Sequence, residues 1–156
     1  MTESFIRELV VRLLSWEDAH VGFDAAAEGI PPDVRGTRAG PHSPWELVEH
    51  MRITQHDILD FSTNPGYKEM KWPDKYWPSA PAPKSSAEWD RSLADFRRDR
   101  DALREMALDT SLDLSQKIPH GDGQTYMREL LLVADHTAYH VGQLVLVRQQ
   151  LGIWKK

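Results

Sequence analysis

The chain contains no cysteine, so disulfide bonds, thiolate metal ligands and a cysteine nucleophile are all excluded. Long basic clusters are also missing: none exceeds the group Arg97, Arg98 and Arg100, and the formal net charge is −5. A surface built for nucleic acid is therefore not expected. No apolar run approaches the length of a bilayer span, and the first ten residues, with Glu3 and Glu8, lack the pattern of a secretory signal. We expect a soluble, cytoplasmic protein with no nucleic-acid partner and no membrane partner.

A convincing strand pattern is missing as well. At 156 residues the chain fits a single domain, 1–156, that is long enough to bury most of its apolar surface. Apolar residues recur at spacings of three and four over four long ranges, which is typical of helices. We expect these helices at about Thr2–Glu28, from Ser43, from Ser85, and from about Thr125 to Leu151. The predicted fold class is all-α.

Capping signals mark the ends of these ranges. Ser43 and Ser85 each precede a glutamate by three residues, which is the pattern of a capping box. Gly29 and Gly152 are the expected C-terminal stops of the first and last ranges. The first range carries one apolar stripe, made of Phe5, Leu9, Leu13, Trp16 and His20. The last range is apolar on nearly every side between 130 and 147, so we expect a central helix that also meets a partner subunit.

The segment 63–84 holds five of the ten prolines together with Tyr67, Trp72, Tyr76 and Trp77. Connections of this length are usually functional or disordered, and four large aromatic residues argue against disorder. We expect an ordered flap over the end of the bundle. Two interpretations stay open: a hydrophobic plug that covers the core, or a lid in which Trp72, Tyr76 and Trp77 wall an apolar substrate pocket.

Two histidines four residues apart, His136 and His140, lie within the apolar run of the last helix. This spacing places both rings on one helix face, about 6 Å apart along the axis. His50 lies inside the apolar arc of the second predicted helix. A charged imidazole would be costly there, so these rings should be neutral and need a partner. That partner is a metal ion, which binds the neutral ring, or a set of backbone carbonyls.

Three further polar residues, His20, Arg100 and His56, lie on the predicted helices. His20 lies on the stripe of the first range, where it is a core histidine, a metal ligand, an outer-shell partner of the ligands or a proton carrier. Arg100 faces inward, either paired with a carboxylate such as Asp57 or Asp24, or as an anion anchor for substrate. His56 points to the opposite side of its helix and should be solvated.

Three neutral imidazoles with one open position describe a catalytic site of the zinc type rather than a structural one. Imidazole suits Zn, Ni, Cu or Fe equally well. No glutamate directly follows His136, so the helical metalloprotease pattern is absent. An open metal position lowers the pKa of a bound water or thiol. Since the chain has no cysteine, a thiol nucleophile would come from a cosubstrate.

Longer motifs surround these histidines. They run Pro41-His42-Ser43-Pro44-Trp45-Glu46-Leu47-Val48-Glu49-His50, Tyr76-Trp77-Pro78, Pro119-His120-Gly121-Asp122-Gly123-Gln124-Thr125 and Asp135-His136-Thr137-Ala138-Tyr139-His140-Val141-Gly142-Gln143. Over nearly its whole length the chain resembles the DinB-like (DinB/YfiT-like) family of bacterial metalloenzymes. The resemblance implies a four-helix bundle with long crossover connections, usually a homodimer. It also implies one divalent ion per chain, Zn or Ni, on His50, His136 and His140. Related branches include S-transferases and a maleylpyruvate isomerase that use a low-molecular-weight thiol.

Three functions are compatible with these observations. The first is a metal-dependent transferase or hydrolase that uses the open coordination position. The second is a metal-binding dimer with a structural or sensory role and no turnover, whose site would be sealed by four protein ligands. The third is a binder of an organic ligand without a metal. The substrate and the physiological metal are not encoded in any motif of the sequence.

Overall fold

The structure is a computed structural model that describes residues 2–15 and 17–154. Its elements follow in the order α1 (Glu3–Leu13), α2 (Phe23–Ala27), the 3₁₀-helix η1 (Pro32–Val34), α3 (Pro44–Thr63), α4 (Ser86–Leu108) and α5 (Tyr126–Gln150). Within these ranges no β-strand occurs, and only an isolated bridge pairs Lys117 with Thr125. The all-α prediction is confirmed.

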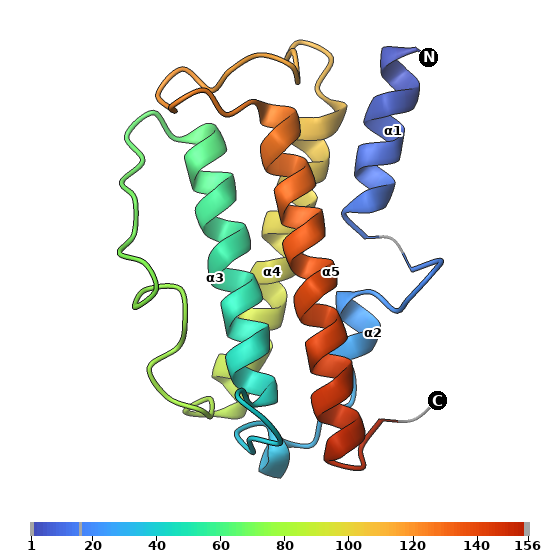
Figure 1. The fold of residues 1–156 in the computed structure, drawn as a ribbon, viewed down its shortest axis with the longest axis vertical. Helices are drawn as coiled ribbons and strands as arrows, with labels where there is room; N and C mark the ends of the chain where they lie inside the picture. Colours follow the sequence, from blue (N-terminus) through green and yellow to red (C-terminus); the bar gives the residue numbers. More distant parts are fainter. Residues whose placement is uncertain (1, 16, 155–156) are drawn as a thin grey trace.

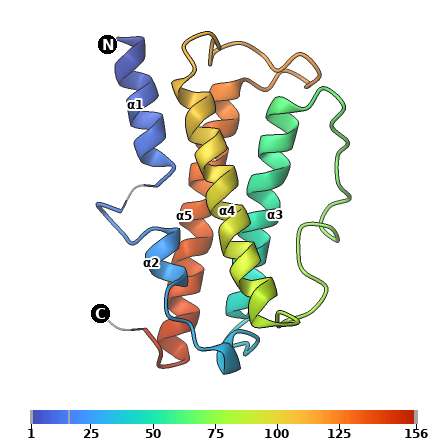
Figure 2. The same ribbon diagram turned by 180° about the vertical axis from the view of Figure 1, so that it is seen from behind.

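The helices form a bundle in which α3 and α4 run in one direction and α1 and α5 in the other (Figure 1). Seen from both sides, α2 continues below α1, so that these two short helices together occupy the fourth position of the bundle (Figure 2). The α3–α4 connection, residues 64–85, descends along the full length of α3 because α3 and α4 are parallel. A four-helix bundle with a long crossover connection is therefore confirmed.

The first predicted helix is wrong in its extent. Instead of continuing to Glu28, α1 ends at Leu13, and Gly22 is the N-cap of the separate five-residue helix α2. The break lets the two pieces meet different neighbours, because α1 packs chiefly on α4 whereas α2 packs on α5. His20 lies exposed in the intervening loop, so its predicted place on a buried stripe is also wrong. Trp16 lies outside the described residues.

The starts of the other helices agree with their capping signals. Ser43 and Glu46 form a complete capping box at α3. At α4 the Ser85 side chain accepts from the Glu88 backbone N–H, but the Glu88 carboxylate accepts from Lys84 instead of the cap residue. The Thr125 hydroxyl caps α5. Each interaction satisfies an N–H group that the first helical turn leaves without a backbone partner.

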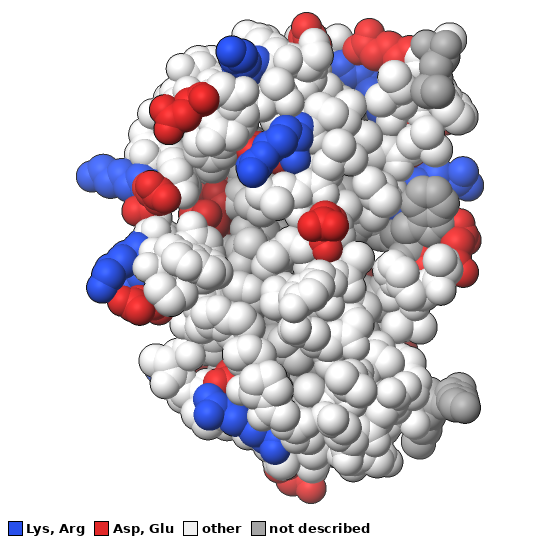
Figure 3. Space-filling view, in the orientation of Figure 1, with Lys and Arg blue, Asp and Glu red and all other residues white. Residues whose placement is uncertain are grey.

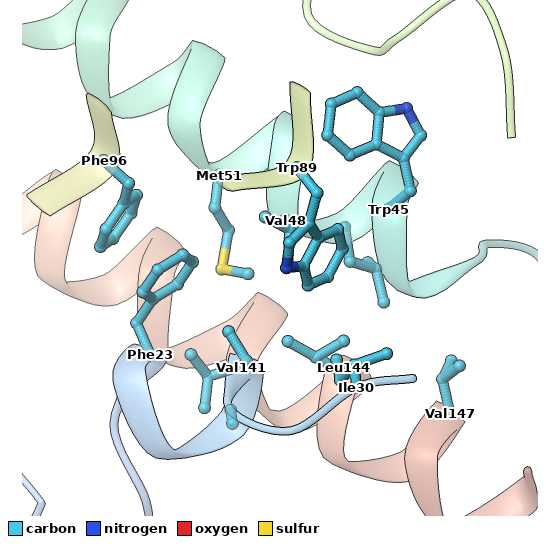
Figure 4. Packing of buried hydrophobic residues seen from close by; sticks show 13 residues of the cluster. Phe23, Ile30, Trp45, Val48, Met51, Trp89, Phe96, Val141, Leu144 and Val147 are labelled. Carbon is cyan, nitrogen blue, oxygen red and sulfur yellow. The ribbon is translucent and has the colours of Figure 1, made fainter. Parts of the chain in front are cut away.

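Two hydrophobic clusters fill the bundle, one near each end. The first contains Trp45, Met51, Trp89 and Leu144, together with Phe23 and Phe96, whose rings stack at 3.7 Å (Figure 4). The second joins α1, α4 and the first half of α5. On α5, Ala134 is the last residue of the second cluster and Val141 is the first residue of the first cluster. His136 and His140 lie in this interval, so the bundle carries its polar layer between two apolar ones.

Helix α5 departs from one expectation. By length and composition it is apolar enough to cross a membrane, although no run of that kind was expected. Its Leu130 and Leu144 are fully buried against the rest of the bundle, and 39% of its most apolar window is buried. A long helix that is buried on several faces is apolar all round for that reason. Helix α5 is therefore a partly buried core helix of the bundle.

Candidate metal centre

Three histidines from two helices converge at the centre of the bundle. His50 projects from α3, and His136 and His140 project from α5. The Nε2 atom of His50 lies 3.0 Å from Nε2 of His136 and 3.1 Å from Nε2 of His140. His50 and His140 are buried, while His136 is half-buried. The predicted convergence of the three rings is confirmed by these distances.

Hydrogen bonds on the far side of two rings fix which nitrogen carries the proton. The Nδ1–H of His50 donates to the backbone carbonyl of Tyr76 at 2.6 Å. The Nδ1–H of His140 donates to Oε1 of Gln143 at 2.8 Å. In a neutral ring the other nitrogen, Nε2, then carries a lone pair. Two lone pairs therefore face each other across 3.1 Å, an arrangement that a shared cation would stabilise.

The surroundings keep these rings neutral. Burial, together with the charges of His140 and His50, lowers the pKa of His136 to about 3. Burial also lowers the pKa of His50 to about 4, although the hydrogen bond to Tyr76 partly opposes it. The pKa of His140 is lowered by burial as well. At neutral pH, protons therefore compete only weakly with a metal ion for the Nε2 atoms of these three histidines.

The geometry fits a divalent ion. A tetrahedral site with metal–nitrogen bonds of about 2.0–2.1 Å separates its nitrogen atoms by about 3.3 Å. The observed separations of 3.0 and 3.1 Å need to open by only a few tenths of an ångström. Within the described part of the chain, these three histidines are the one group of metal-ligating side chains close enough to share an ion. A tetrahedral ion held there would keep its fourth position for another ligand.

The crossover segment 64–85 contributes directly to this centre. The indole ring of Trp77 stacks on the His50 ring at 3.8 Å with an interplanar angle of 1°. On its other face it stacks on His42 at 4.1 Å. Trp77 also packs against the hydrophobic cluster around Trp45 and Met51. The segment thus packs against one ring of the histidine cluster, a role that neither the plug nor the lid interpretation described.

Three other residues considered in the sequence analysis, Trp72, His20 and His56, lie outside the histidine cluster. Trp72 is 67% exposed and touches Tyr76, so it does not wall the site. His20 is outside the histidine group, and its Nδ1 lies 2.9 Å from the carbonyl oxygen of Val21. The exposure predicted for His56 is confirmed, although its Nδ1 also bonds to the Asp99 carboxylate.

Arg100 pairs with Asp24, one of the two carboxylates proposed for it, at 2.7 Å. Burial alone would raise the pKa of Asp24, but hydrogen bonds from Arg97 and Arg100 outweigh this effect and hold the pKa below its usual value. Asp57, the other proposed partner, instead accepts hydrogen bonds from the hydroxyl groups of Tyr67 and Tyr76. The Arg100–Asp24 pair ties α4 to α2, as the first of the two interpretations of Arg100 predicted.

Two neighbours of the histidine cluster were not predicted from the sequence. Gln143 orients His140, and the three-residue spacing on one helix was the signal that could have identified it. His42, which precedes α3, joins the site through Trp77. No spacing rule links His42 to Trp77, because the contact depends on the path of the crossover segment.

Comparison with known proteins agrees with this architecture. A sequence model described as the DinB superfamily matches residues 15–144, which include all three histidines. Searches of curated proteins and of solved structures gave no match. The matched region covers most of the chain, including all of α3 and the part of α5 that carries His136 and His140. The chain therefore belongs to the DinB superfamily.

Proposed function

We propose that this protein is a metal-dependent transferase or hydrolase whose divalent ion is held by His50, His136 and His140. The observation that carries the proposal is the convergence of three neutral imidazoles, two of them with Nε2 lone pairs fixed by hydrogen bonds at Nδ1. Such ligands need no proton release and little rearrangement before an ion binds. Three protein ligands leave a tetrahedral ion with one open position, as catalytic sites do.

When bound, the ion would supply a Lewis acid that lowers the pKa of a water or thiol ligand. The chain's own residues hold and orient the ligand rings. The Tyr76 carbonyl fixes the orientation of His50, the Gln143 amide fixes that of His140, and Trp77 covers the face of His50. Because the chain has no cysteine, a thiol nucleophile would come from a low-molecular-weight cosubstrate. Zn or Ni is the proposed ion, since both accept imidazole ligands. The lack of cysteine also agrees with a cytoplasmic location.

The decisive test compares the metal content of wild type with that of His136→Ala. Elemental analysis of purified protein should give about one divalent ion per wild-type chain and a near-complete loss in the variant. His56→Ala is the matched control, because His56 is an exposed histidine outside the centre. A thiol-transfer and ester-hydrolysis screen on the metal-loaded protein then tests turnover. Full metal occupancy in His136→Ala would refute the site.

A metal-binding protein without turnover is the second candidate. A structural site is expected to be sealed by four protein ligands, and a catalytic site keeps one position open. The centre has three histidines among the described residues, and His136 is half-buried rather than sealed. These two observations favour the enzyme. An inert metal-loaded protein, unable to bind any added thiol at the ion, would favour the second candidate.

A homodimer through α5 forms part of the proposal. Leu131, Tyr139 and Leu146 on this helix are 45%, 65% and 53% exposed, and their spacings of eight and seven residues place them on one face of α5. The lower part of the face over α5 is largely uncharged (Figure 3). Pairing of two copies would bury this surface. Sedimentation analysis should give a dimer for wild type and a monomer for Leu146→Glu, and a monomeric wild type would refute this interface.

A further inference from the structure

A cavity of about 450 Å³ lies between α3, α5 and the crossover segment, beside the histidine centre. Figure 3 shows a recess in the upper half of this face, with acidic atoms inside it and a basic group at its rim. Tyr76 belongs to both places: its carbonyl accepts from His50, and its side chain lines the cavity. Leu132 and Glu129, also in the wall, precede His136 by four and seven residues. They therefore lie about 6 to 11 Å from it along the helix axis.

The lining offers an excess of negative charge and of hydrogen-bond acceptors. Four carboxylates line it, those of Asp57, Glu69, Asp122 and Glu129, against the single guanidinium of Arg128. Glu129 is only 2% exposed, whereas the Arg128 side chain that pairs with it is 55% exposed. The bond between them therefore neutralises the buried carboxylate only partly, because water screens the exposed partner.

An unsatisfied acceptor lies in the same wall. Oε1 of Gln124 is buried and has no hydrogen-bond partner. It packs closely against Gly121, where an added Cβ would come within 2.8 Å of this oxygen. A buried acceptor without a donor is unfavourable, and rotation of the Gln124 side chain toward the cavity would let a ligand N–H group satisfy this oxygen. A ligand that carries hydrogen-bond donors as well as positive charge would therefore fit this wall.

The rest of the lining argues for an organic ligand over a bare metal ion. The tyrosine hydroxyls of Tyr67 and Tyr76 already donate to the Asp57 carboxylate at 2.9 and 2.8 Å. Ile58, Phe61 and Leu132 supply apolar wall, which a hydrated metal ion cannot use and an alkyl chain can. His120 lines the cavity too, with Nε2 donating to the Phe61 carbonyl.

We propose that this cavity binds the ammonium or guanidinium group of an organic substrate whose other end reacts at the three-histidine centre. The inference rests on the proposed function for the reaction, but the cation site itself needs no turnover. Both groups combine positive charge with several N–H donors, which match two carboxylates and the Gln124 oxygen. The apolar wall then contacts the chain that joins the cation to the reacting end.

The test uses zinc-supplemented, ¹⁵N-labelled protein and four probes: butylammonium, butylguanidinium, butyrate and tetramethylammonium. The first two should shift the backbone amide signals of Asp57, Glu129 and residues 121–124. Butyrate, with an alkyl chain of similar length and the opposite charge, should leave them unchanged. Tetramethylammonium, a cation without N–H donors, should bind at least several-fold more weakly. Equal binding of butyrate, or of Mg²⁺ at the same amides, would overturn the proposal.

Charge-removing variants locate the site. Asp57→Asn and Glu129→Gln should each weaken butylguanidinium binding about tenfold, the loss expected for one charge-assisted hydrogen bond. Asp101→Asn, which removes an exposed carboxylate of α4 outside the cavity, is the control and should bind as wild type does. If Glu129→Gln does not fold, Glu69→Gln at an exposed position of the rim should still weaken binding two- to threefold. Unchanged affinity in the folded variants would refute the site.

Metal content separates this proposal from the proposed function. Protein that binds the two N–H cations at these amides but retains no divalent ion would support the cation site and contradict the metal-dependent enzyme. Protein with one ion per chain and no response to either cation would refute the cation site and leave the metal centre intact.

Discussion

The pH dependence of metal binding offers a quantitative test of the buried histidines. A ring with the usual pKa of about 6.5 is mostly neutral at pH 7, but only about 3% of it is neutral at pH 5. Proton competition then weakens metal binding about 25-fold for each ring, and about 600-fold for two. In this protein the pKa of His50 is lowered to about 4 and that of His136 to about 3. Both rings therefore stay largely neutral at pH 5.

We expect proton competition at His50 and His136 to lower the zinc affinity of the folded protein less than about threefold between pH 7 and pH 5, and burial to limit the loss at His140 as well. The measurement is a competition titration against a chelator calibrated at each pH, with circular dichroism to confirm the fold. A free peptide of residues 126–150 is the reference, because its His136 and His140 are solvated and should show the steep loss. A fall of several hundredfold in the intact protein would show that the rings are not desolvated before the ion binds.

Three further predictions follow from individual contacts. Ser43→Ala should lower the free energy of unfolding by about 1–2 kcal/mol in urea titrations, more than Ser85→Ala, because Ser43 caps α3 and also donates to the Pro81 carbonyl. Trp77→Leu should weaken zinc binding about tenfold in the competition assay, whereas Trp72→Leu, at an exposed position, should leave it unchanged. Metal-free protein should lose stability as the pH falls from 6.5 toward 5. The reason is that His50 and His136 bind protons in the unfolded chain but stay neutral in the folded state, because burial lowers their pKa values. Equal urea midpoints at pH 6.5 and pH 5 would contradict this prediction.

The sequence predicted the histidine centre because its determinants are periodic. The four-residue spacing of His136 and His140 fixes their common face, and the apolar arc around His50 turns it toward the same core. The capping box at Ser43 set the start of α3 for a similarly local reason. These features depend on residues within a few turns of one helix, which pattern analysis can read.

The errors came where non-local packing decides the structure. The apolar spacing of the first range continues through residues 14–22, so it gives no sign that the chain leaves the helix there. The break becomes favourable only because α1 and α2 then pack on different helices. Likewise, the segment 64–85 has no periodicity that could place Trp77 on His50. Its cavity is also acidic where an apolar pocket was expected, since Asp57 and Glu129 come from α3 and α5, which are far apart in the sequence but pack together.

X-ray absorption at the zinc edge of the zinc-loaded protein tests the central claim most directly, because it reports the ligands of the ion itself. The spectrum should fit three imidazole nitrogens at about 2.0–2.1 Å and one further light ligand that is not imidazole. Replacement of that fourth ligand on addition of a small thiol should introduce sulfur at about 2.3 Å. A spectrum with fewer than three imidazoles, or with four protein ligands that no thiol displaces, would contradict the account.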